Sequence, residues 1–359
     1  MLKEKIVKLI KEQGAIPFDK FMSLSAVAEE GYYRNSNPLG LKGDFITAPE
    51  ISQVFGELIG LWLLDCWFKL GSPDKCFLVE LGAGRGTLMA DILRATKKVK
   101  EFHDSLNIKI VEINQELIHL QKSILQDYTN ISWVKSVEEI DVDAPVLIYS
   151  NEFFDSLPTK QYLLKENNCF ELMVDIDKNN KLKLVFLKTE NYLLPKEIIP
   201  TDKEIIYETS PMANSIFNYL SAIVAEFSGV ILTIDYGYTT PEFRNSIRGY
   251  KNHKVLDVFE IINQVGEVDF TYNVNFKELH MAVNELKIDK FKVITQKEFL
   301  ENLGIHERAS ILLKNIVETK DKQDFIEQIT TLISPTQMGE KFKAMCLSKN
   351  IKNLAIFEK

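Results

Sequence analysis

One short glycine-rich stretch constrains the fold of this chain more than any other feature of its sequence. In "VELGAGRGTLMADIL", an apolar run ends at Glu80 and an amphipathic helical pattern begins at Thr87. Three glycines stand between them, at Gly82, Gly84 and Gly86. Glycine is needed where the backbone turns with positive φ or where a ligand approaches the main chain. The first turn of a helix adds N–H groups without a partner inside the helix. The stretch therefore predicts a strand, a ligand-binding turn and a helix capped by Thr87.

The segments on either side of this turn predict an α/β fold. The apolar runs "CFLVEL", "IKIVEI", "ISWVKS", "PVLIYS" and "GVILTIDYGY" alternate with helical patterns such as "ELIHLQKSILQDY". Such alternation is typical of a parallel sheet with helices on its faces. In contrast, "QYLLKENNCFELMVDIDKNNKLKLVFLK" predicts antiparallel strands with a turn at residues 177–180. We also expect a helix over residues 211–227 and an edge strand near "FKAMCLSKN".

The sequence contains no linker that separates independent domains. Residues 1–70 predict an N-terminal helical cover that carries the loop "GDFITAPE", with a first helix that ends at Gly14. Residues 71–359 predict a Rossmann-like core with an insertion near 160–207 and a helical substrate region near 240–335. The expected fold class is therefore α/β, with an N-terminal helical cover and with antiparallel and helical insertions.

The spacing of the glycines bears on the type of ligand. A dinucleotide fingerprint, G-x-G-x-x-G, would require a glycine at position 87, but this chain has Thr87 there and Gly86 one residue earlier. The pattern E-x-G-x-G-x-G resembles motif I of the class I methyltransferases, which bind S-adenosylmethionine. A second acid, Glu112, ends the next predicted strand, where an acid in doubly wound sheets accepts ribose hydroxyls. The alternative is a glycine-rich turn flanked by surface acids.

Two further stretches carry candidate functional residues. The strand in "PVLIYSNEFFDSLP" is followed by Asn151, Glu152 and Asp155. In methyltransferases of this architecture such residues face the transferred methyl group, although Asn151 and Asp155 could instead cap the turn. In "KGDFITAPEISQVFGELIGLW", Thr47 and Glu50 predict a capping box at the start of a helix. The Asp-Phe pair at positions 44 and 45 is not needed for that cap. We expect the segment from Gly43 to Glu50 to fold over the methyl end of the cofactor, with Phe45 shielding the sulfonium and Asp44 adding a carboxylate for the incoming cation. The alternative is a capped helix preceded by a solvated Asp44.

Motifs along nearly the whole chain resemble those of the MidA-like methyltransferases, relatives of the mitochondrial complex I assembly factor. The stretches that carry the resemblance are "GDFITAPEISQVFGELIG", "VELGAGRGTLMADILRA", "NEFFDSLPTKQY", "DYGY", "GEVDFTYNVNF", "TQKEFLENLGI" and "SPTQMGEKFKAMCLSK". The chain departs from the family at Asn114-Gln115, where Ser-Pro is usual, and between Asp257 and Gly266, where prolines are lost. The second departure affects a loop that would be substrate-specific.

The resemblance implies a class I fold, S-adenosylmethionine as cofactor, and methylation of an arginine in a protein such as a complex I (NADH dehydrogenase) subunit. A guanidinium keeps its proton in water, so carboxylates must hold it and orient one nitrogen. The implied catalytic residues are Glu152, Asp155, Asp44 and Asn151. The implied cofactor-binding residues are Glu80, Gly82, Ala83, Gly84, Gly86, Glu112 and Thr47.

Other functions remain as alternatives at this point. The chain could be an assembly factor that binds S-adenosylmethionine without catalysis, or a methyltransferase with another acceptor. A nicotinamide-dependent oxidoreductase is disfavoured by the position of the third glycine. The sequence does not indicate the oligomeric state.

Composition excludes several classes of partner and site. The net charge is −8 without a long basic run, which argues against nucleic acid as the main partner. No apolar run approaches the roughly 20 residues of a membrane span. Four scattered cysteines and five histidines show no metal-site spacing, and thiols of this kind suit a reducing compartment. The N-terminal segment contains Glu4 and Glu12 but no arginine, unlike a mitochondrial presequence. We therefore expect a cytoplasmic protein.

Overall fold

The computed structural model describes residues 2–27, 31–32, 47–196, 198, 203–240, 242–251, 254–283, 285–351 and 353–357. The chain folds into two compact units. We call one the antiparallel unit; it comprises Met1–Phe45, Phe154–Ile216 and Tyr238–Ala282. We call the other the parallel-sheet unit; it comprises Ile46–Phe153, Phe217–Gly237 and Val283–Lys359.

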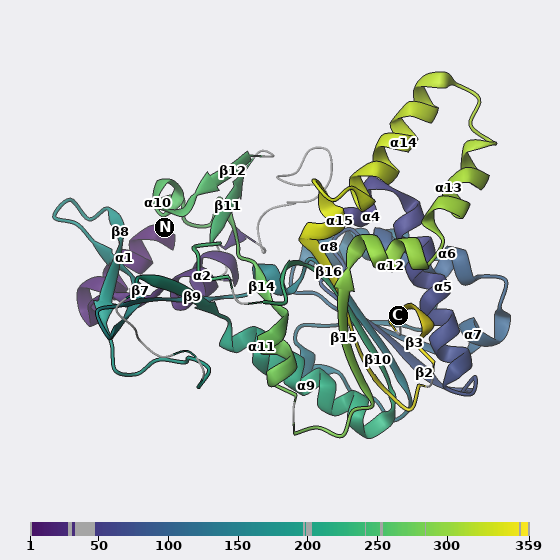
Figure 1. Ribbon diagram of the computed structural model, residues 1–359, viewed down its shortest axis with the longest axis horizontal. Coiled ribbons are helices and arrows are strands. Elements are labelled where there is room, and N and C mark those ends of the chain that lie inside the picture. Colours follow the sequence, from purple (N-terminus) through teal and green to yellow (C-terminus); the bar gives the residue numbers. More distant parts are fainter. Residues whose placement is uncertain are drawn as a thin grey trace. The chain divides into compact units, whose positions relative to one another are not determined.

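The parallel-sheet unit is built around a twisted sheet with the strand order β15-β16-β10-β5-β2-β3-β4 (Figure 1). Four neighbouring pairs of strands in this sheet are parallel: β10 with β5, β5 with β2, β2 with β3, and β3 with β4. Parallel neighbours require a crossover connection between them. The strand order reverses between β2 and β5, and ligands of doubly wound sheets bind at such a switch point. The strands are β2 (Cys76–Leu81), β3 (Leu106–Val111), β4 (Ile131–Val134), β5 (Val146–Asn151), β10 (Gly229–Tyr238), β15 (Lys290–Thr295) and β16 (Phe342–Lys349).

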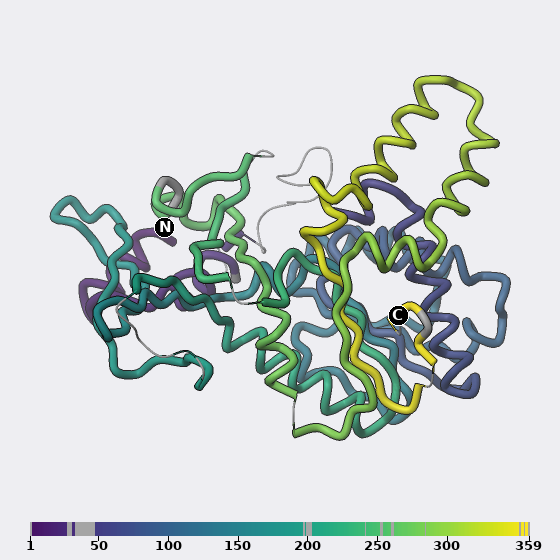
Figure 2. Tube along the Cα trace, in the orientation of Figure 1, coloured from purple at the N-terminus to yellow at the C-terminus, as the bar shows by residue number. Residues whose placement is uncertain are grey.

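The predicted parallel strands are thus confirmed, but the edge strand near the C-terminus is wrongly placed. Strand β16 pairs with β10 on one side and with β15 on the other, antiparallel in both cases, so it is interior (Figure 2). Its burial explains this position, since Ala344 to Ser348 are all buried. Strand β15 was not predicted, because residues 290–295 lie in the stretch near 240–335 that was expected to be helical.

Helices surround this sheet, and α13 and α14 form a hairpin that extends away from it (Figure 1). They are α4 (Ala48–Ile51), α5 (Gln53–Lys69), α6 (Thr87–Thr96), α7 (Lys100–Ser105), α8 (Gln115–Ile124), α12 (Gln296–Asn302), α13 (Ile305–Leu313), α14 (Thr319–Ile333) and α15 (Met338–Lys341), together with the short 3-10 turns η1 (Val137–Glu139) and η3 (Ala355–Phe357). Helix α9 (Pro211–Phe227) is divided: its residues up to Ile216 belong to the antiparallel unit, and those from Phe217 belong to this one.

Helices α5 and α6 approach each other unusually closely, because α5 carries two glycines one turn apart. A Cβ atom at Gly56 would lie 2.6 Å from Cβ of Asp91. A Cβ atom at Gly60 would lie 2.9 Å from Cα of Ile92. Both distances are too short for a side chain, so glycine permits this contact between the two helices.

A buried ion network fastens α5 to both α6 and α13. The Glu57 carboxylate, whose side chain is 4% exposed, accepts from Nη1 of Arg94 at 2.7 Å and from Nε of Arg308 at 2.8 Å. Arg94 also donates to Asp91 at 2.6 Å. Burial by itself would raise the pKa of Glu57, but the hydrogen bonds from the two arginines outweigh it, so the pKa is lowered.

The predicted capping box at Thr47 is wrong. Thr47 stands at the N-cap of α4, but its side chain makes no cap hydrogen bond, and α4 is only four residues long. The backbone is extended at Ser52, which ends α4 and begins α5. The Ser52 hydroxyl accepts from the Val54 N–H at 3.4 Å, so serine supplies the cap of the long helix.

This arrangement moves the expected cost of losing a cap from Thr47 to Ser52. Ser52→Ala is expected to lower the free energy of unfolding by about 0.5–2 kcal/mol, because a buried cap is lost. Thr47→Ala is expected to lower it by less than ~0.5 kcal/mol, as for a side chain without a cap bond. Urea unfolding of both variants measures these losses. A larger loss of unfolding free energy for Thr47→Ala than for Ser52→Ala would show that Thr47 does cap its helix.

The antiparallel unit contains a sheet with the strand order β1-β7-β6-β9, in which β8 also pairs with β7. The turn between β7 and β8 covers residues 177–180 as predicted, and Asn180 has φ +58. A second sheet has the order β12-β11-β13. The strands of these two sheets are β1 (Ile16–Pro17), β6 (Lys160–Lys165), β7 (Asn168–Ile176), β8 (Leu182–Lys188), β9 (Ile205–Thr209), β11 (Arg248–Lys251), β12 (Lys254–Asp257) and β13 (Asp269–Thr271). The short strand β14 (Val274–Asn275) belongs to neither sheet.

Helices α1 (Leu2–Gln13) and α2 (Phe18–Val27) bury their apolar faces within the antiparallel unit. Gly14 has φ +83 and ends α1, as predicted. The rings of Phe18, Phe21 and Phe270 pack together there at centroid distances of 5.7–6.2 Å. The expected N-terminal cover of residues 1–70 is thus divided, since α1 and α2 belong to this unit whereas α4 and α5 belong to the parallel-sheet unit. The remaining helical segments are α10 (Val258–Ile261), α11 (Phe276–Met281) and η2 (Phe154–Ser156).

Candidate functional site

The glycine loop follows β2 at the switch point and leads into α6. Gly82, Gly84 and Gly86 have φ values of +62, +53 and +86, so each adopts a conformation that side chains disfavour. The Gly86 N–H donates to the carbonyl of Ala83 at 2.8 Å and closes the turn. Gly86 is the N-cap of α6, so the prediction that Thr87 caps this helix is wrong.

Two of the glycines also lie close to the side chains of neighbouring segments. A Cβ atom at Gly82 would lie 2.9 Å from Cδ2 of Phe153, which follows β5. A Cβ atom at Gly86 would lie 3.3 Å from Cγ of Gln121 on α8. The loop therefore lies between a residue that follows β5 and a residue on α8.

Both predicted acids lie buried beside this loop. Glu80, on β2, is 2% exposed and accepts from the Tyr149 hydroxyl at 3.1 Å. Burial raises its pKa to about 8, and the hydrogen bond from Tyr149 only partly opposes this. Glu112 directly follows β3, and its Oε1 accepts from the N–H groups of Ile113 at 2.8 Å and Asn114 at 2.9 Å. Burial raises the pKa of Glu112 as well.

The raised pKa of Glu80 gives a prediction about stability without a bound ligand. The folded chain holds a proton on Glu80 up to about pH 8, whereas an unfolded chain releases it near 4.5, the ordinary pKa of a glutamate. The free energy of unfolding therefore declines as the pH rises between these values. Glu80→Gln is expected to flatten this decline. Urea unfolding of both proteins at about pH 5 and about pH 8 measures it; equal slopes would show that Glu80 is ionised when folded.

Sequence reasoning missed Gln121, which joins the loop to the second acid. Its Nε2 donates to the Gly84 carbonyl at 2.7 Å and to Oε2 of Glu112 at 3.3 Å. Its Oε1 accepts from Nε1 of Trp133 at 2.8 Å. The residue is fully buried. A signal existed: Gln121 lies on the apolar face of α8, four residues after the buried Leu117.

The turn after β5 places Asn151 and Glu152 at the carboxyl end of that strand. Glu152 has φ +52, a strained conformation for a residue other than glycine. Its Oε1 accepts from the Ala48 N–H at 3.3 Å and from Nδ2 of Asn151 at 3.0 Å. The Oδ1 atom of Asn151 is buried without a hydrogen-bond partner among the described residues. A buried acceptor of this kind is unfavourable unless a ligand supplies the donor.

The described end of the "GDFITAPE" stretch lies against the same turn and the glycine loop. Besides the contact of Ala48 with Glu152, Oε1 of Glu50 accepts from the Thr87 hydroxyl at 2.5 Å. Oε2 of Glu50 lies 4.0 Å from Nε of Arg85. Glu50 thus holds the glycine loop instead of capping its own helix. Asp44 and its neighbour Phe45 lie outside the described residues.

Asp155 belongs to the antiparallel unit, in η2. Its Oδ2 accepts from the Thr271 hydroxyl at 3.0 Å, and its carbonyl accepts from the Tyr272 N–H at 3.1 Å. The residue keeps some exposed surface, but its carboxyl is enclosed, and burial raises the pKa to about 6. The partial burial and the hydrogen bond from Thr271 show an acid held in place by its own unit.

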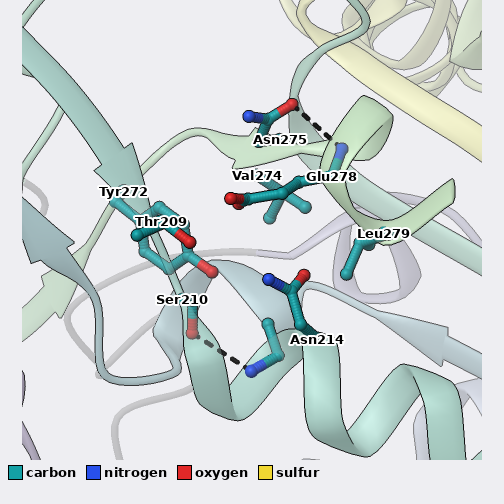
Figure 3. A pocket seen from close by; sticks show the side chains of 9 residues that line it. Thr209, Ser210, Asn214, Tyr272, Val274, Asn275, Glu278 and Leu279 are labelled. Carbon is teal, nitrogen blue, oxygen red and sulfur yellow. Dashed lines mark hydrogen bonds between the residues drawn. The ribbon is translucent and has the colours of Figure 1, made fainter. Parts of the chain in front are cut away.

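The antiparallel unit also contains a small pocket, lined by both polar and apolar side chains, that the sequence did not indicate (Figure 3). Its volume of about 10 Å³ suits a single water molecule. Glu278 lies on its wall, and burial raises the pKa of this acid to about 6 against hydrogen bonds from Thr209, Tyr207 and Asn214. The caps of α9 and α11, formed by the side chains of Ser210 and Asn275, also line it (Figure 3).

Among the residues that the structure describes, no group of three or more His, Cys, Asp or Glu side chains could hold a metal ion. In the same part of the chain, no helix is long and apolar enough to cross a bilayer.

Comparison with known proteins identifies the family. A family model described as S-adenosyl-L-methionine-dependent methyltransferase matches residues 58–295, well over half of the chain. The chain belongs to this family of methyltransferases. The resemblance to methyltransferases found in the sequence is thereby confirmed, as is S-adenosylmethionine as the cofactor.

Relatives of this methyltransferase cover most of its length. Protein arginine methyltransferase NDUFAF7 of Danio rerio is 34% identical over 87% of this chain and 78% of its own. The Caenorhabditis elegans homologue is 32% identical over 96% and 86%, and the Homo sapiens protein is 31% identical over 94% and 81%. These three relatives are named as mitochondrial proteins. That finding points away from the cytoplasm, so the predicted location is wrong: the acidic residues near the N-terminus were a poor guide to location.

A solved structure confirms the fold of the methyltransferase. A Burkholderia thailandensis protein bound to S-adenosyl-homocysteine superposes with a TM-score of 0.85, covering 100% of this chain and 94% of that one at 22% identity. The α/β class I methyltransferase fold expected from the sequence is therefore correct.

The residues of the methyltransferase fit its cofactor chemically. The loop presents three glycines with positive φ, which lets a ligand reach the main chain. Among the described residues, the hydrogen bonds of the two buried acids Glu80 and Glu112 include no cation, which leaves these carboxyl groups able to accept from polar groups of such a ligand. The orphan acceptor of Asn151 lies at the end of β5, the strand next to β2.

Proposed function

We propose that this methyltransferase transfers the methyl group of S-adenosylmethionine to a guanidinium nitrogen of an arginine in a protein. The observation that carries the proposal is the turn after β5, where strained Glu152 and the orphan Oδ1 of Asn151 stand together. Catalytic turns commonly retain such strain and unpaired acceptors, because their partner is the substrate. The relatives named as protein arginine methyltransferases support the choice of acceptor.

The cofactor-binding residues follow from the glycine loop and its neighbours. When bound, the cofactor supplies a sulfonium-activated methyl group. Glu112 would accept the ribose hydroxyls, and Glu80 would balance the ammonium charge, which favours the ionised form of this acid. The main chain from Gly82 through Ala83 and Gly84 to Gly86 would line the ligand. Thr47, at the start of α4, completes the proposed set.

The catalytic residues that we propose are Glu152, Asp155, Asn151 and Asp44. An arginine side chain arrives as a cation, so a carboxylate is needed to hold it and to aim one nitrogen. Glu152 would take that role, with Asn151 Oδ1 accepting a second guanidinium N–H. Transfer of a methyl cation to nitrogen releases one proton, which a carboxylate near its pKa can accept; Asp155, with a pKa of about 6, suits this step. Asp44 would add negative charge at the approach of the acceptor.

We further propose that the acceptor is a subunit of a respiratory NADH dehydrogenase, in line with the family that the sequence resembles. The competing function is a factor that binds S-adenosylmethionine and assists assembly without catalysis.

One experiment separates these functions. The purified protein is titrated with S-adenosylmethionine by calorimetry, then incubated with the labelled cofactor and a mitochondrial extract. We expect binding, a labelled protein band, and methylarginine in its digest. Gly84→Val is expected to abolish binding, because a branched side chain at φ +53 distorts the loop that receives the cofactor. Binding without any label in the extract would favour the assembly factor. Normal binding by Gly84→Val would show that the cofactor does not bind at this loop.

A further inference from the structure

The side-chain amide of Gln121 makes hydrogen bonds through both its NH₂ group and its oxygen, and its partners allow only one orientation of the amide. The Gly84 carbonyl and the Glu112 carboxylate are acceptors, so they require the NH₂ group. The indole N–H of Trp133 is only a donor, so it requires the amide oxygen. Both N–H bonds and one oxygen lone pair are therefore used, and a carboxylate or a thioether at this position could not replace them.

These three contacts connect segments that lie on, or directly follow, three neighbouring strands of the sheet. Gly84 lies in the loop after β2, Glu112 follows β3, and Trp133 lies on β4. Helix α8 brings Gln121 beneath the loop, where its Cγ would be 3.3 Å from a Cβ at Gly86. A side chain at position 86 would therefore press against Gln121, in addition to the strain that the φ of +86 would impose on it.

We propose that Gln121 is a positioning residue for the cofactor: it fixes the Gly84 peptide and the Glu112 carboxylate relative to each other. The inference rests on the proposed roles of this loop and of Glu112. The Glu112 carboxylate is also held by the N–H groups of Ile113 and Asn114 on Oε1, so Gln121 is what restrains its other oxygen. Trp133 acts through Gln121, since its indole fixes the amide that holds the loop.

The test measures binding of S-adenosylhomocysteine by calorimetry, so it needs no acceptor. Gln121→Met keeps the length of the side chain and removes all three hydrogen bonds. We expect binding to weaken by about 10- to 100-fold, as when the partners that orient a ligand-binding group are lost. The matched control is Gln296→Met, because Gln296 is also fully buried in this unit and donates to the Leu332 carbonyl. This control is expected to lose stability while binding as the wild type does.

A double-mutant cycle distinguishes positioning from general destabilisation. Trp133→Phe should weaken binding in the wild-type background, because the amide loses its anchor. In the Gln121→Met background the same change should have no further effect, because Trp133 acts only through the amide. Additive effects of the two substitutions would overturn this coupling, and unchanged binding by Gln121→Met would overturn the proposal. If the wild type itself failed to bind S-adenosylhomocysteine, that result would refute the proposed cofactor site, on which the role of Gln121 rests.

Discussion

A Glu152→Gln variant is expected to bind S-adenosylmethionine with wild-type affinity and to transfer its methyl group at least ~10²-fold more slowly, the loss typical of one electrostatic stabiliser. The two contacts of the Glu152 carboxylate with Ala48 and Asn151 both use Oε1. A glutamine can keep them with its amide oxygen, so the turn at φ +52 is retained while the negative charge is removed. Calorimetry measures the affinity, and labelled methyl transfer in a mitochondrial extract measures the rate.

The control for this variant is Glu116→Gln, a change of the same kind at an exposed position in the first turn of α8. It should leave both quantities unchanged. Wild-type turnover by Glu152→Gln would show that the carboxylate only anchors Ala48. A matching loss of cofactor affinity would place Glu152 in the cofactor site instead.

The second large effect is on stability. Replacing Arg94 and Arg308 together by methionine is expected to lower the free energy of unfolding by about 3–5 kcal/mol at neutral pH, because Glu57 is left as a buried charge without a cation. Methionine retains much of the aliphatic packing of each arginine, so the loss reports mainly on the charge. Urea unfolding of the wild type and the double variant measures the difference.

The pKa of Glu57 determines how this loss of unfolding free energy changes with pH. The lowered pKa of Glu57 contributes stability above the unfolded pKa of about 4.5, and the contribution is lost as the pH falls through the folded value. In the double variant, Glu57 instead takes up a proton readily, which relieves the penalty in acid. The difference between the two proteins should therefore shrink towards about pH 4. Lys8→Met, which removes an exposed pair with Glu12, should cost less than about 0.5 kcal/mol. A pH-independent loss would mean that packing, not charge, holds Glu57.

Much of the fold could be predicted because its signals are local. The glycine loop, the apolar strands and helix α9 each occupy one continuous stretch whose periodicity or turn chemistry is visible in the sequence. The errors occur where a partner distant in sequence decides the outcome. Glu50 has the spacing of a capping box but bonds Thr87, 37 residues later. Strand β16 has the composition of an edge strand but lies between β10 and β15.

The candidate site shows the same division. Glu80 and Glu112 could be predicted because the carboxyl ends of parallel strands meet at one edge of the sheet. Gln121 could not be assigned its role, because its three partners come from the connections after β2 and β3 and from β4. The positive φ of Glu152 has no signal in the sequence, since glutamate seldom adopts it.

The extended backbone at Ser52 has a mechanical consequence. Beyond it, α5 is a 17-residue helix clamped to α6 through Gly56 and Gly60, and neither helix can slide without a steric clash. Before it, the four residues of α4 are held by the bonds of Ala48 to Glu152 and of Glu50 to Thr87. The short helix is also packed, since Ala48 is fully buried in the core of this unit. The turn after β5 is therefore anchored, through Ala48, to the same core that holds the α5–α6 pair.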